Sequence, residues 1–255
     1  MVKPTIHKGQ IFSTNYGNCR VVKYIDAHTI LIEFENTHYR KWVYASALRK
    51  GEVKDTSLPT IFGKGYCGDK YSWTKNNKIY LLWHSMLERV YANQKHKNKT
   101  YKTRSVCSRW HSLTNFGDDI QKMKNWNREG FQLDKDLRIL GNKRYGKSTC
   151  SFVPQEINAQ FTGSYTVKSN FLPGVCRWKK GYMAQLYKGN KNNLYGPYKT
   201  EWKAHVRYCR EKSKHVRNLA IKYKQDLHPD VFDTLMSMTP RKVHEFTKGL
   251  KYDYY

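Results

Sequence analysis

Acidic residues are scarce in this chain: 20 Asp and Glu stand against 47 Lys and Arg, which gives a formal net charge of +27 over 255 residues. Long apolar runs are also missing, and no stretch approaches the roughly 20 residues that a membrane-spanning helix needs. A charge imbalance of this size destabilises a compact fold through self-repulsion. We therefore expect a polyanionic partner and no membrane insertion, with nucleic acid favoured over a membrane surface.

Closely spaced cysteines are lacking as well. No two of the six cysteines form a C-x-x-C pair, which argues against a structural zinc knuckle. The N-terminus lacks the apolar segment of a secretory signal, so we expect reduced, mostly buried thiols in a cytoplasm. No cysteine is marked as a nucleophile by its neighbours.

Residues 1–50 predict a set of short strands separated by turns. The expected strands are rich in β-branched and aromatic residues: Gln10–Thr14, Cys19–Ile25, Thr29–Phe34 and Tyr39–Tyr44. We interpret them as a small β-barrel similar to Src-homology-3 or Tudor domains, with Trp42 and Tyr44 filling its core. In the alternative interpretation, an accessory contact with DNA or protein is formed by Tyr39, Arg40, Lys41 and Trp42.

Residues 51–75 lack periodicity and are rich in glycine, so they predict a linker or an extended arm. The next segment, residues 76–163, begins with two amphipathic helices, Asn77–Tyr91 and roughly His111–Met123. These helices are expected to pack beneath the part of the segment that follows them.

That part, Phe131–Phe161, changes pattern. It contains an acidic strand, a loop rich in Gly and Lys, an apolar strand, and a helix that begins at Pro154, where a missing N–H costs nothing. Strand, loop, strand and helix carrying an Asp and an Asn form the layout of a ββα-metal nuclease centre. In such a centre, carboxylate and amide oxygens hold a hard cation beside a phosphate.

The segment from Tyr80 to Phe161 resembles the HNH-type proteins of tailed phages. The matching residues are Trp83, Met86, Arg89, Tyr91, Val106, Trp110, Asn115, Phe116, Leu133, Asp134, Lys135, Asp136, Tyr145, Cys150, Val153, Pro154 and Asn158. The resemblance implies a homing-endonuclease lineage and, if a phage encodes the chain, location in the host-cell cytoplasm.

The same resemblance assigns roles to single residues. Asp134 and Asn158 would be ligands of Mg²⁺ in an active centre, and Asp136 would be a third. Lys135 occupies the position at which the family usually carries its histidine base, and Thr149 replaces the asparagine that supports the metal loop. A lysine base needs a strongly lowered pKa, whereas two neighbouring aspartates favour the charged form.

Residues 164–225 predict three strands and a long helix, Glu201 to about Gln225, with Thr200 as its N-cap. This segment resembles the Apetala-type DNA-binding domain of plant transcription factors and phage nucleases. The matching residues are Gly174, Val175, Gly181, Tyr182, Ala184, Leu186, Gly196, Tyr198, Thr200, Glu201 and Ala204. Residues 226–255 predict a short helix, Pro229–Met238, and a tail.

In that family the sheet lies in the major groove, which implies Arg177, Gln185 and Tyr187 as DNA contacts. Arg177 is expected to read guanine and Gln185 adenine, while Tyr182 joins them only if a bulge turns its side chain. Arginines common in the family are replaced by Cys176 and Tyr187, which lowers the expected sequence specificity.

Further basic residues are candidates for phosphate contacts. They are Lys99, Lys102 and Arg104 in a basic run, Lys179 and Lys180 in a turn, and a stripe on the long helix formed by Lys203, Arg207, Arg210, Lys214 and Arg217. Like charges spaced three and four residues apart repel unless an anion lies along them.

The sequence thus predicts an α+β multidomain protein that binds double-stranded DNA and derives from an HNH homing endonuclease with a degenerate cleavage centre. An active Mg²⁺-dependent endonuclease is the alternative, with His84, His96 or His111 supplying the base. A second alternative is an interaction protein that binds a host nucleoprotein complex. The oligomeric state and the target site are left open.

Overall fold

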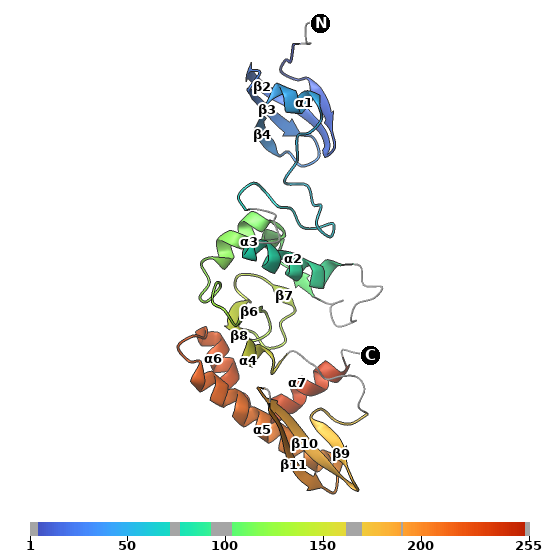
Figure 1. The fold of residues 1–255 in the computed structure, drawn as a ribbon, viewed down its shortest axis with the longest axis vertical. Coiled ribbons are helices and arrows are strands. Elements are labelled where there is room, and N and C mark those ends of the chain that lie inside the picture. The colour runs from blue at the N-terminus through green and yellow to red at the C-terminus, as the bar shows by residue number, and fades with distance from the viewer. Residues whose placement is uncertain (1–4, 72–76, 93–103, 162–169, 190, 253–255) are drawn as a thin grey trace. The chain divides into compact units, whose positions relative to one another are not determined.

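The computed structural model describes residues 5–71, 77–92, 104–161, 170–189 and 191–252 (Figure 1). Helices and strands are mixed along the chain, which confirms the predicted α+β class. Contacts divide the chain into two compact units: Met1–Tyr91 with Ser108–Gly117, and Ala92–Cys107 with Asp118–Tyr255. The central segment predicted from the sequence therefore contributes to both units.

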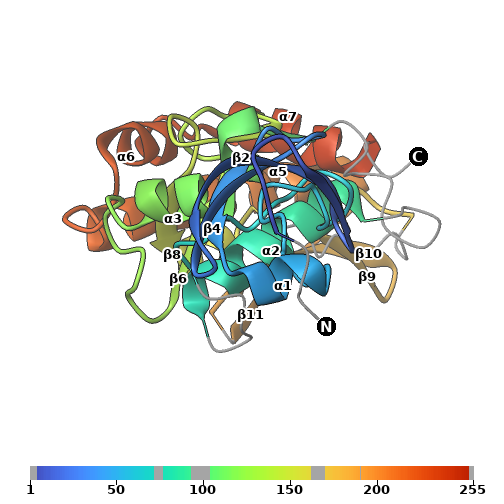
Figure 2. The same ribbon diagram turned by 90° about the horizontal axis from the view of Figure 1, so that it is seen from above.

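The first unit opens with a four-stranded antiparallel sheet in sequence order. Its elements are β1 (Ile11–Thr14), β2 (Gly17–Asp26), β3 (Thr29–Phe34), β4 (Arg40–Val43) and the helix α1 (Ala45–Arg49). Strand β2 shifts register twice against β3, and the strands curve strongly (Figure 2). In the described residues no ladder joins β4 to β1, because both edge strands are short and α1 contacts β1. The predicted barrel is an open curved sheet.

The prediction that Trp42 and Tyr44 fill the core of this sheet is wrong. Trp42 is 51% exposed and Tyr44 is 59% exposed. Trp42 pairs with Leu31 across the ladder between β3 and β4, whereas the next pair, Ile30 and Val43, is buried. Since successive strand residues point to opposite faces, Ile30 and Val43 occupy the core and Trp42 lies on the outer face.

The arm predicted for residues 51–75 is irregular over its described part, but hydrogen bonds hold it in place. The N–H of Tyr66 donates to the carbonyl of His111 at 3.0 Å, and the N–H of Leu113 donates to the carbonyl of Tyr66 at 2.9 Å. The predicted helices are α2 (Lys78–Tyr91) and α3 (Leu113–Ile120), and a 3-10 turn, Ser108–His111, precedes α3. The apolar stripe of α2 is a buried core face, as its period predicts.

The second unit contains the predicted strand–loop–strand–helix segment. Its elements are β5 (Ser105–Val106), β6 (Phe131–Asp134), β7 (Arg144–Tyr145), β8 (Ser151–Pro154) and α4 (Gln155–Asn158). Strands β6 and β8 pair antiparallel, so that Asp134 lies opposite Ser151, and β5 pairs parallel with β7. Helix α4 begins directly after Pro154, where the sequence predicts it.

A three-stranded antiparallel sheet and three helices complete the second unit. They are β9 (Val175–Trp178), β10 (Gly181–Lys188), β11 (Lys191–Tyr198), α5 (Glu201–Lys222), α6 (Pro229–Met236) and α7 (Pro240–Tyr252). The sheet order is β11-β10-β9. The hydroxyl of Thr200 accepts the N–H of Lys203 at 3.3 Å, which confirms the predicted N-cap of α5.

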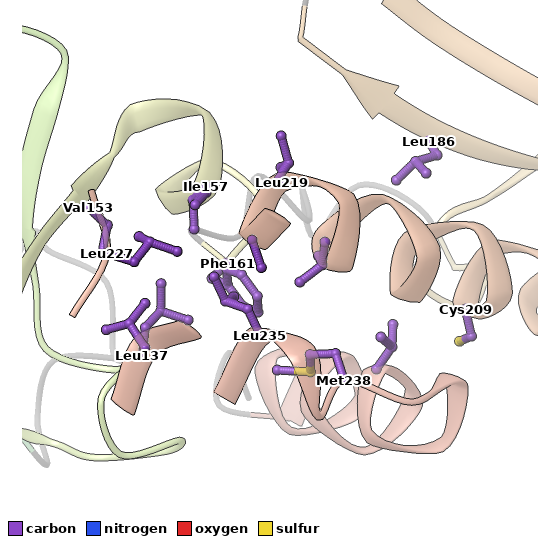
Figure 3. Packing of buried hydrophobic residues seen from close by; sticks show 14 of the residues in the cluster. Leu137, Val153, Ile157, Phe161, Leu186, Cys209, Leu219, Leu227, Leu235 and Met238 are labelled. Atoms are coloured by element: carbon purple, nitrogen blue, oxygen red, sulfur yellow. The ribbon is translucent and has the colours of Figure 1, made fainter. Parts of the chain in front are cut away.

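One hydrophobic core joins the β6–β8–α4 segment to the C-terminal sheet and helices (Figure 3). Its members include Leu137, Val153, Ile157, Phe161, Ala184, Leu186, Tyr208, Cys209, Val216, Leu219, Ala220, Leu227, Val231, Leu235, Met238 and Val243. Polar links cross the same boundary: Arg138 is 3.0 Å from Asp230, and Glu156 is 2.7 Å from Lys222. The two segments are therefore packed together and are not joined only by a tether.

Candidate functional site

Asp134 lies at the end of β6, where its buried carboxylate caps the turn that follows. Its Oδ1 accepts the backbone N–H of Asp136 at 3.0 Å and that of Leu137 at 2.8 Å. Burial, and then the nearby charge of Asp136, raise the pKa of Asp134 to about 6, although both backbone donors act in the opposite direction. The residue predicted as a metal ligand thus has a structural role in this fold.

Lys135 is the most enclosed charged side chain of the centre, with only 3% of its side chain exposed. Its Nζ donates to Oδ1 of Asp136, lies 3.5 Å from the carbonyl of Asn142, and sits 5.6 Å from the centroid of the Tyr145 ring. Burial lowers the pKa of Lys135, while the charge of Asp136 opposes that shift. An ammonium group with an anionic partner therefore fills the space beside Asp134.

Asn158 is the last residue of α4 and reaches back toward β6. Its Nδ2 donates to Oε1 of Gln132 at 2.6 Å. Gln132 and Asp134 are two residues apart on one strand and so share a face. The fold thus brings the Asp and the Asn of the predicted centre to the same side of β6.

This donor set fits a divalent cation poorly. The Oδ1 of Asp134 is engaged by two backbone N–H groups, and the carboxylate of Asp136 is paired with the ammonium of Lys135. Across the parts of the chain that are described, no group of three His, Cys, Asp or Glu side chains is placed to hold a metal ion. Asp134 and Asn158 are the residues that would have to hold one.

Sequence reasoning missed Asn142, which organises the loop between β6 and β8. Its Nδ2 donates to the carbonyls of Lys135 and Arg144, both at 2.7 Å. Thr149 supports the same loop, since its hydroxyl donates to the carbonyl of Arg144 at 2.8 Å. The Gly141-Asn142 pair is a turn signal that could have indicated this role.

Two of the three histidines considered as alternative bases do not lie in the same unit as Asp134. His84 and His111 belong to the first unit, whereas Asp134 belongs to the second. The ring of His111 is 2.9 Å from the hydroxyl of Tyr91, and burial lowers its pKa. His96 lies outside the described residues.

The C-terminal sheet has one face against α5 and one outer face. Ala184 and Leu186 are buried in the core with α5 residues, so the residues that alternate with them, Met183, Gln185 and Tyr187, lie on the outer face. Gln185 donates from Nε2 to the hydroxyl of Tyr187 at 3.1 Å. Two of the three predicted base-contacting residues therefore stand side by side on the outer face.

Arg177 does not share that face. It pairs with Tyr182 across the ladder between β9 and β10, and its guanidinium lies 4.9 Å from the Tyr182 ring centroid. Tyr182 pairs with Tyr198 and Ala184 with Tyr195, so the extra residue of the bulge belongs to β11 and leaves the Tyr182 side chain where alternation places it. Arg177 is exposed, but on the side of the sheet that carries Val175.

The predicted basic stripe of α5 divides into exposed and engaged residues. Lys203, Arg210 and Lys214 are exposed. Arg207 pairs with Glu211 at 3.0 Å and lies 4.9 Å from the Tyr195 ring centroid. Arg217 is half-buried.

The remaining predicted phosphate contacts lie in a turn and in a basic run. Lys179 and Lys180 form the exposed turn between β9 and β10. Arg104 is half-buried, and its charge acts on Lys135. Lys99 and Lys102 fall outside the described residues.

Within the described ranges, no helix combines the length and the apolar character needed to cross a membrane. Comparison of the chain with known protein families, with characterised proteins and with solved structures finds no match.

Proposed function

We propose that this chain is a double-stranded-DNA-binding protein that derives from a phage HNH homing endonuclease and has lost its cleavage centre. The observation that carries the proposal is the buried Lys135–Asp136 ion pair within a ββα layout. In this proposal the carboxylate of Asp136 keeps Lys135 charged by opposing the lowering of its pKa by burial. A charged lysine cannot take the proton from water. The scaffold of a nuclease is therefore combined with side chains that do not suit cleavage.

DNA binding is supported by the formal charge of +27 and by where the described cations lie. Lys179, Lys180, Lys203, Arg210 and Lys214 are all exposed and belong to the C-terminal sheet and α5. Neutralising phosphates releases condensed counterions, which gives binding energy that depends on salt but not on sequence. In this proposal the exposed cations bind the phosphates of the duplex, and the sheet recognises its bases.

Cleavage is tested with supercoiled plasmid and with phage genomic DNA in Mg²⁺ or Mn²⁺. Wild-type protein runs beside Asp134→Ala and Asn158→Ala. The proposal expects DNA that stays intact and still shifts on a gel. Nicking by the wild type that disappears in both variants would instead establish an active endonuclease and reject the degenerate centre.

Binding is tested by measuring duplex affinity at several salt concentrations. If about 6–10 phosphates are contacted, affinity falls on the order of 10³–10⁵-fold between 50 and 200 mM salt. A flat response would reject nucleic acid as the partner. It would favour the interaction with a host nucleoprotein complex, for which the exposed Trp42 and Tyr44 offer a surface.

A further inference from the structure

The outer face of the C-terminal sheet is aromatic, apolar and amide-bearing, and none of its described residues carries a charge. By strand alternation from the cross-strand pairs, it displays Cys176, Trp178, Met183, Gln185, Tyr187, Asn192 and Leu194. Trp178, Tyr187 and Leu194 are among the exposed large hydrophobic residues of the chain. The lysines stand at the margins of this face, at 179, 180 and 191.

In the major groove of DNA, the types of side chain on a protein surface determine which bases that surface can recognise. Guanine is read by arginine or lysine, adenine by the amides of asparagine or glutamine, and the thymine methyl group by apolar contact. The outer face offers two amides and exposed apolar groups, and its strands present Arg177 on the opposite side. Its chemistry therefore matches A·T pairs and lacks the groups that select guanine.

Gln185 and Leu194 form a direct cross-strand pair. Opposed residues of an antiparallel ladder have Cβ atoms about 4.5–5.5 Å apart. One base pair presents the adenine N6 and N7 and the thymine methyl group together in the major groove. The Gln185–Leu194 pair can thus address both bases of one A·T pair.

Tyr187 holds the Gln185 amide in the orientation that this contact requires. The amide Nε2 carries two hydrogens, and one of them is donated to the Tyr187 hydroxyl. The second hydrogen and Oε1 remain for adenine N7 and N6. A side chain fixed in advance loses less rotamer entropy on binding than a free one.

We propose that the outer face of β9-β10-β11 selects A·T base pairs in duplex DNA, with Gln185 reading adenine, Leu194 contacting the thymine methyl group and Tyr187 positioning Gln185. The inference rests on the proposed DNA binding and names its specificity. Lys179, Lys180 and Lys191 at the margins of this face, together with the net positive charge of the chain, make it electrostatically complementary to a duplex.

Selection of bound duplexes from a randomised pool tests the preference. Enrichment of A·T pairs is expected, with discrimination of about 5-fold to 150-fold at the position that Gln185 reads. Enrichment of guanine, or of no base, overturns the inference while leaving DNA binding intact. Failure to bind any duplex overturns the proposed function itself, so the two failures are distinguishable.

Altered bases in the selected duplex assign the individual contacts. Replacing adenine by 7-deazaadenine removes N7, which should weaken binding by wild type and leave Gln185→Ala unaffected. Replacing thymine by uracil removes the methyl group, which should weaken wild type and leave Leu194→Ala unaffected. Equal losses in wild type and variant would remove that residue from the interface.

Two further variants separate positioning from contact. Tyr187→Phe keeps the ring and removes the hydroxyl, so it should reduce discrimination at the adenine while overall affinity changes little. Arg177→Ala is the matched control from the other side of the sheet, and the base preference should survive it. A preference lost with Arg177 and kept with Tyr187→Phe would overturn the assignment.

Discussion

His205 in α5 is a buried histidine whose two ring nitrogens are both engaged. Nδ1 is 2.8 Å from the carbonyl of Pro173, and Nε2 is 2.9 Å from Nδ1 of His244 and 3.4 Å from Sγ of Cys209. The carbonyl can only accept, so Nδ1 carries the proton and Nε2 accepts from His244 or Cys209. A second proton on the ring would remove that acceptor.

We expect His205 to contribute a loss of stability as the pH is lowered through the usual histidine range. Burial lowers the pKa of His205 in the folded chain, with the nearby His244 adding to the shift. The unfolded chain then takes up the proton at a higher pH than the folded one, so the free energy of unfolding decreases with falling pH. Urea unfolding at pH 7.5 and pH 5.5 measures this change.

His205→Asn is the variant that isolates this residue, since the asparagine amide does not titrate and can donate to the Pro173 carbonyl. Its stability should depend less on pH than that of wild type. His111 and His215 also have lowered pKa values and act in the same direction, whereas Asp134, whose pKa is raised to about 6, acts in the opposite direction. These groups remain in the variant, so some dependence should persist. An unchanged slope would exclude His205 as a source.

Gly174 lies at the start of the C-terminal sheet. Both its backbone conformation and the lack of room for a side chain require a glycine there. Its φ is +72°, and a Cβ there would lie 2.1 Å from Cδ2 of the buried Tyr208 ring. We expect Gly174→Ala to cost about 1–2 kcal/mol in backbone strain and a further 1–3 kcal/mol or so in overpacking. Thermal unfolding measures the loss.

Gly141 is the matched control for Gly174, because its φ is +79° and nothing lies within 4 Å of a Cβ built on it. Gly141→Ala should therefore lose only the stability that backbone strain costs, without the cost of overpacking. Equal losses in the two variants would show that the Tyr208 ring moves away at little cost.

Local patterns predicted most of the elements, but not α7 (Pro240–Tyr252), where the sequence predicted a tail. The expected strand Thr29–Phe34 is β3, and the helix expected from Glu201 is α5, which starts there because Thr200 caps it. It was harder to predict which face of its sheet each strand residue occupies. Alternation divides the side chains of a strand into two sets, but it does not say which set is buried. Trp42 and Arg177 both illustrate this, since only the pairing with neighbouring strands places them.

The candidate centre was predictable as a layout and not as a set of contacts. The order of β6, β8 and α4 follows from apolar runs, a turn and Pro154. That Lys135 is enclosed by Asp136, Asn142 and Tyr145 depends on how the loop folds back. No local pattern encodes that path.

At the scale of one helix, the exposed cations of α5 should contribute directly to DNA affinity. We expect the triple variant Lys203→Ala, Arg210→Ala, Lys214→Ala to weaken binding on all sequences alike. The slope of log affinity against log salt should become shallower by about 1 for each phosphate contact removed. Fluorescence anisotropy with a labelled duplex provides both quantities.

A second triple variant tests whether the position of the removed charges matters, or only the total charge of the chain. Lys8, Lys23 and Lys50 are exposed residues of the first unit, and replacing them by alanine removes the same charge. This variant should keep the wild-type salt slope. If both triple variants change the slope equally, α5 is not a specific phosphate contact.

At the scale of the whole second unit, the shared core couples segments that are distant in sequence. Leu137 in the loop after β6 is 0% exposed and belongs to the same cluster as Leu186 of β10 and Leu219 of α5. Leu137→Ala should cost about 2–5 kcal/mol and speed amide hydrogen exchange in β10 and α5 as well as in β6. Mass spectrometry of exchanged peptides reads each element separately.

Ile139 provides the control within the same loop, because it is 54% exposed and lies outside that cluster. Ile139→Ala should leave exchange in β10 and α5 at the wild-type rate. Faster exchange confined to β6 and α4 in Leu137→Ala would mean that the two segments open independently.

A shared interior also limits how such a protein can change over evolutionary time. Recombination that exchanged only the sheet and α5 for those of another protein would leave Leu137, Val153 and Ile157 facing a surface that does not complement them. If the chain binds DNA as proposed, new targets are therefore reached more easily by substitutions on the exposed side of β9, β10 and β11 than by exchanging modules. The ββα segment would then persist in descendants as a structural foundation, even where no phosphodiester bond is ever cut.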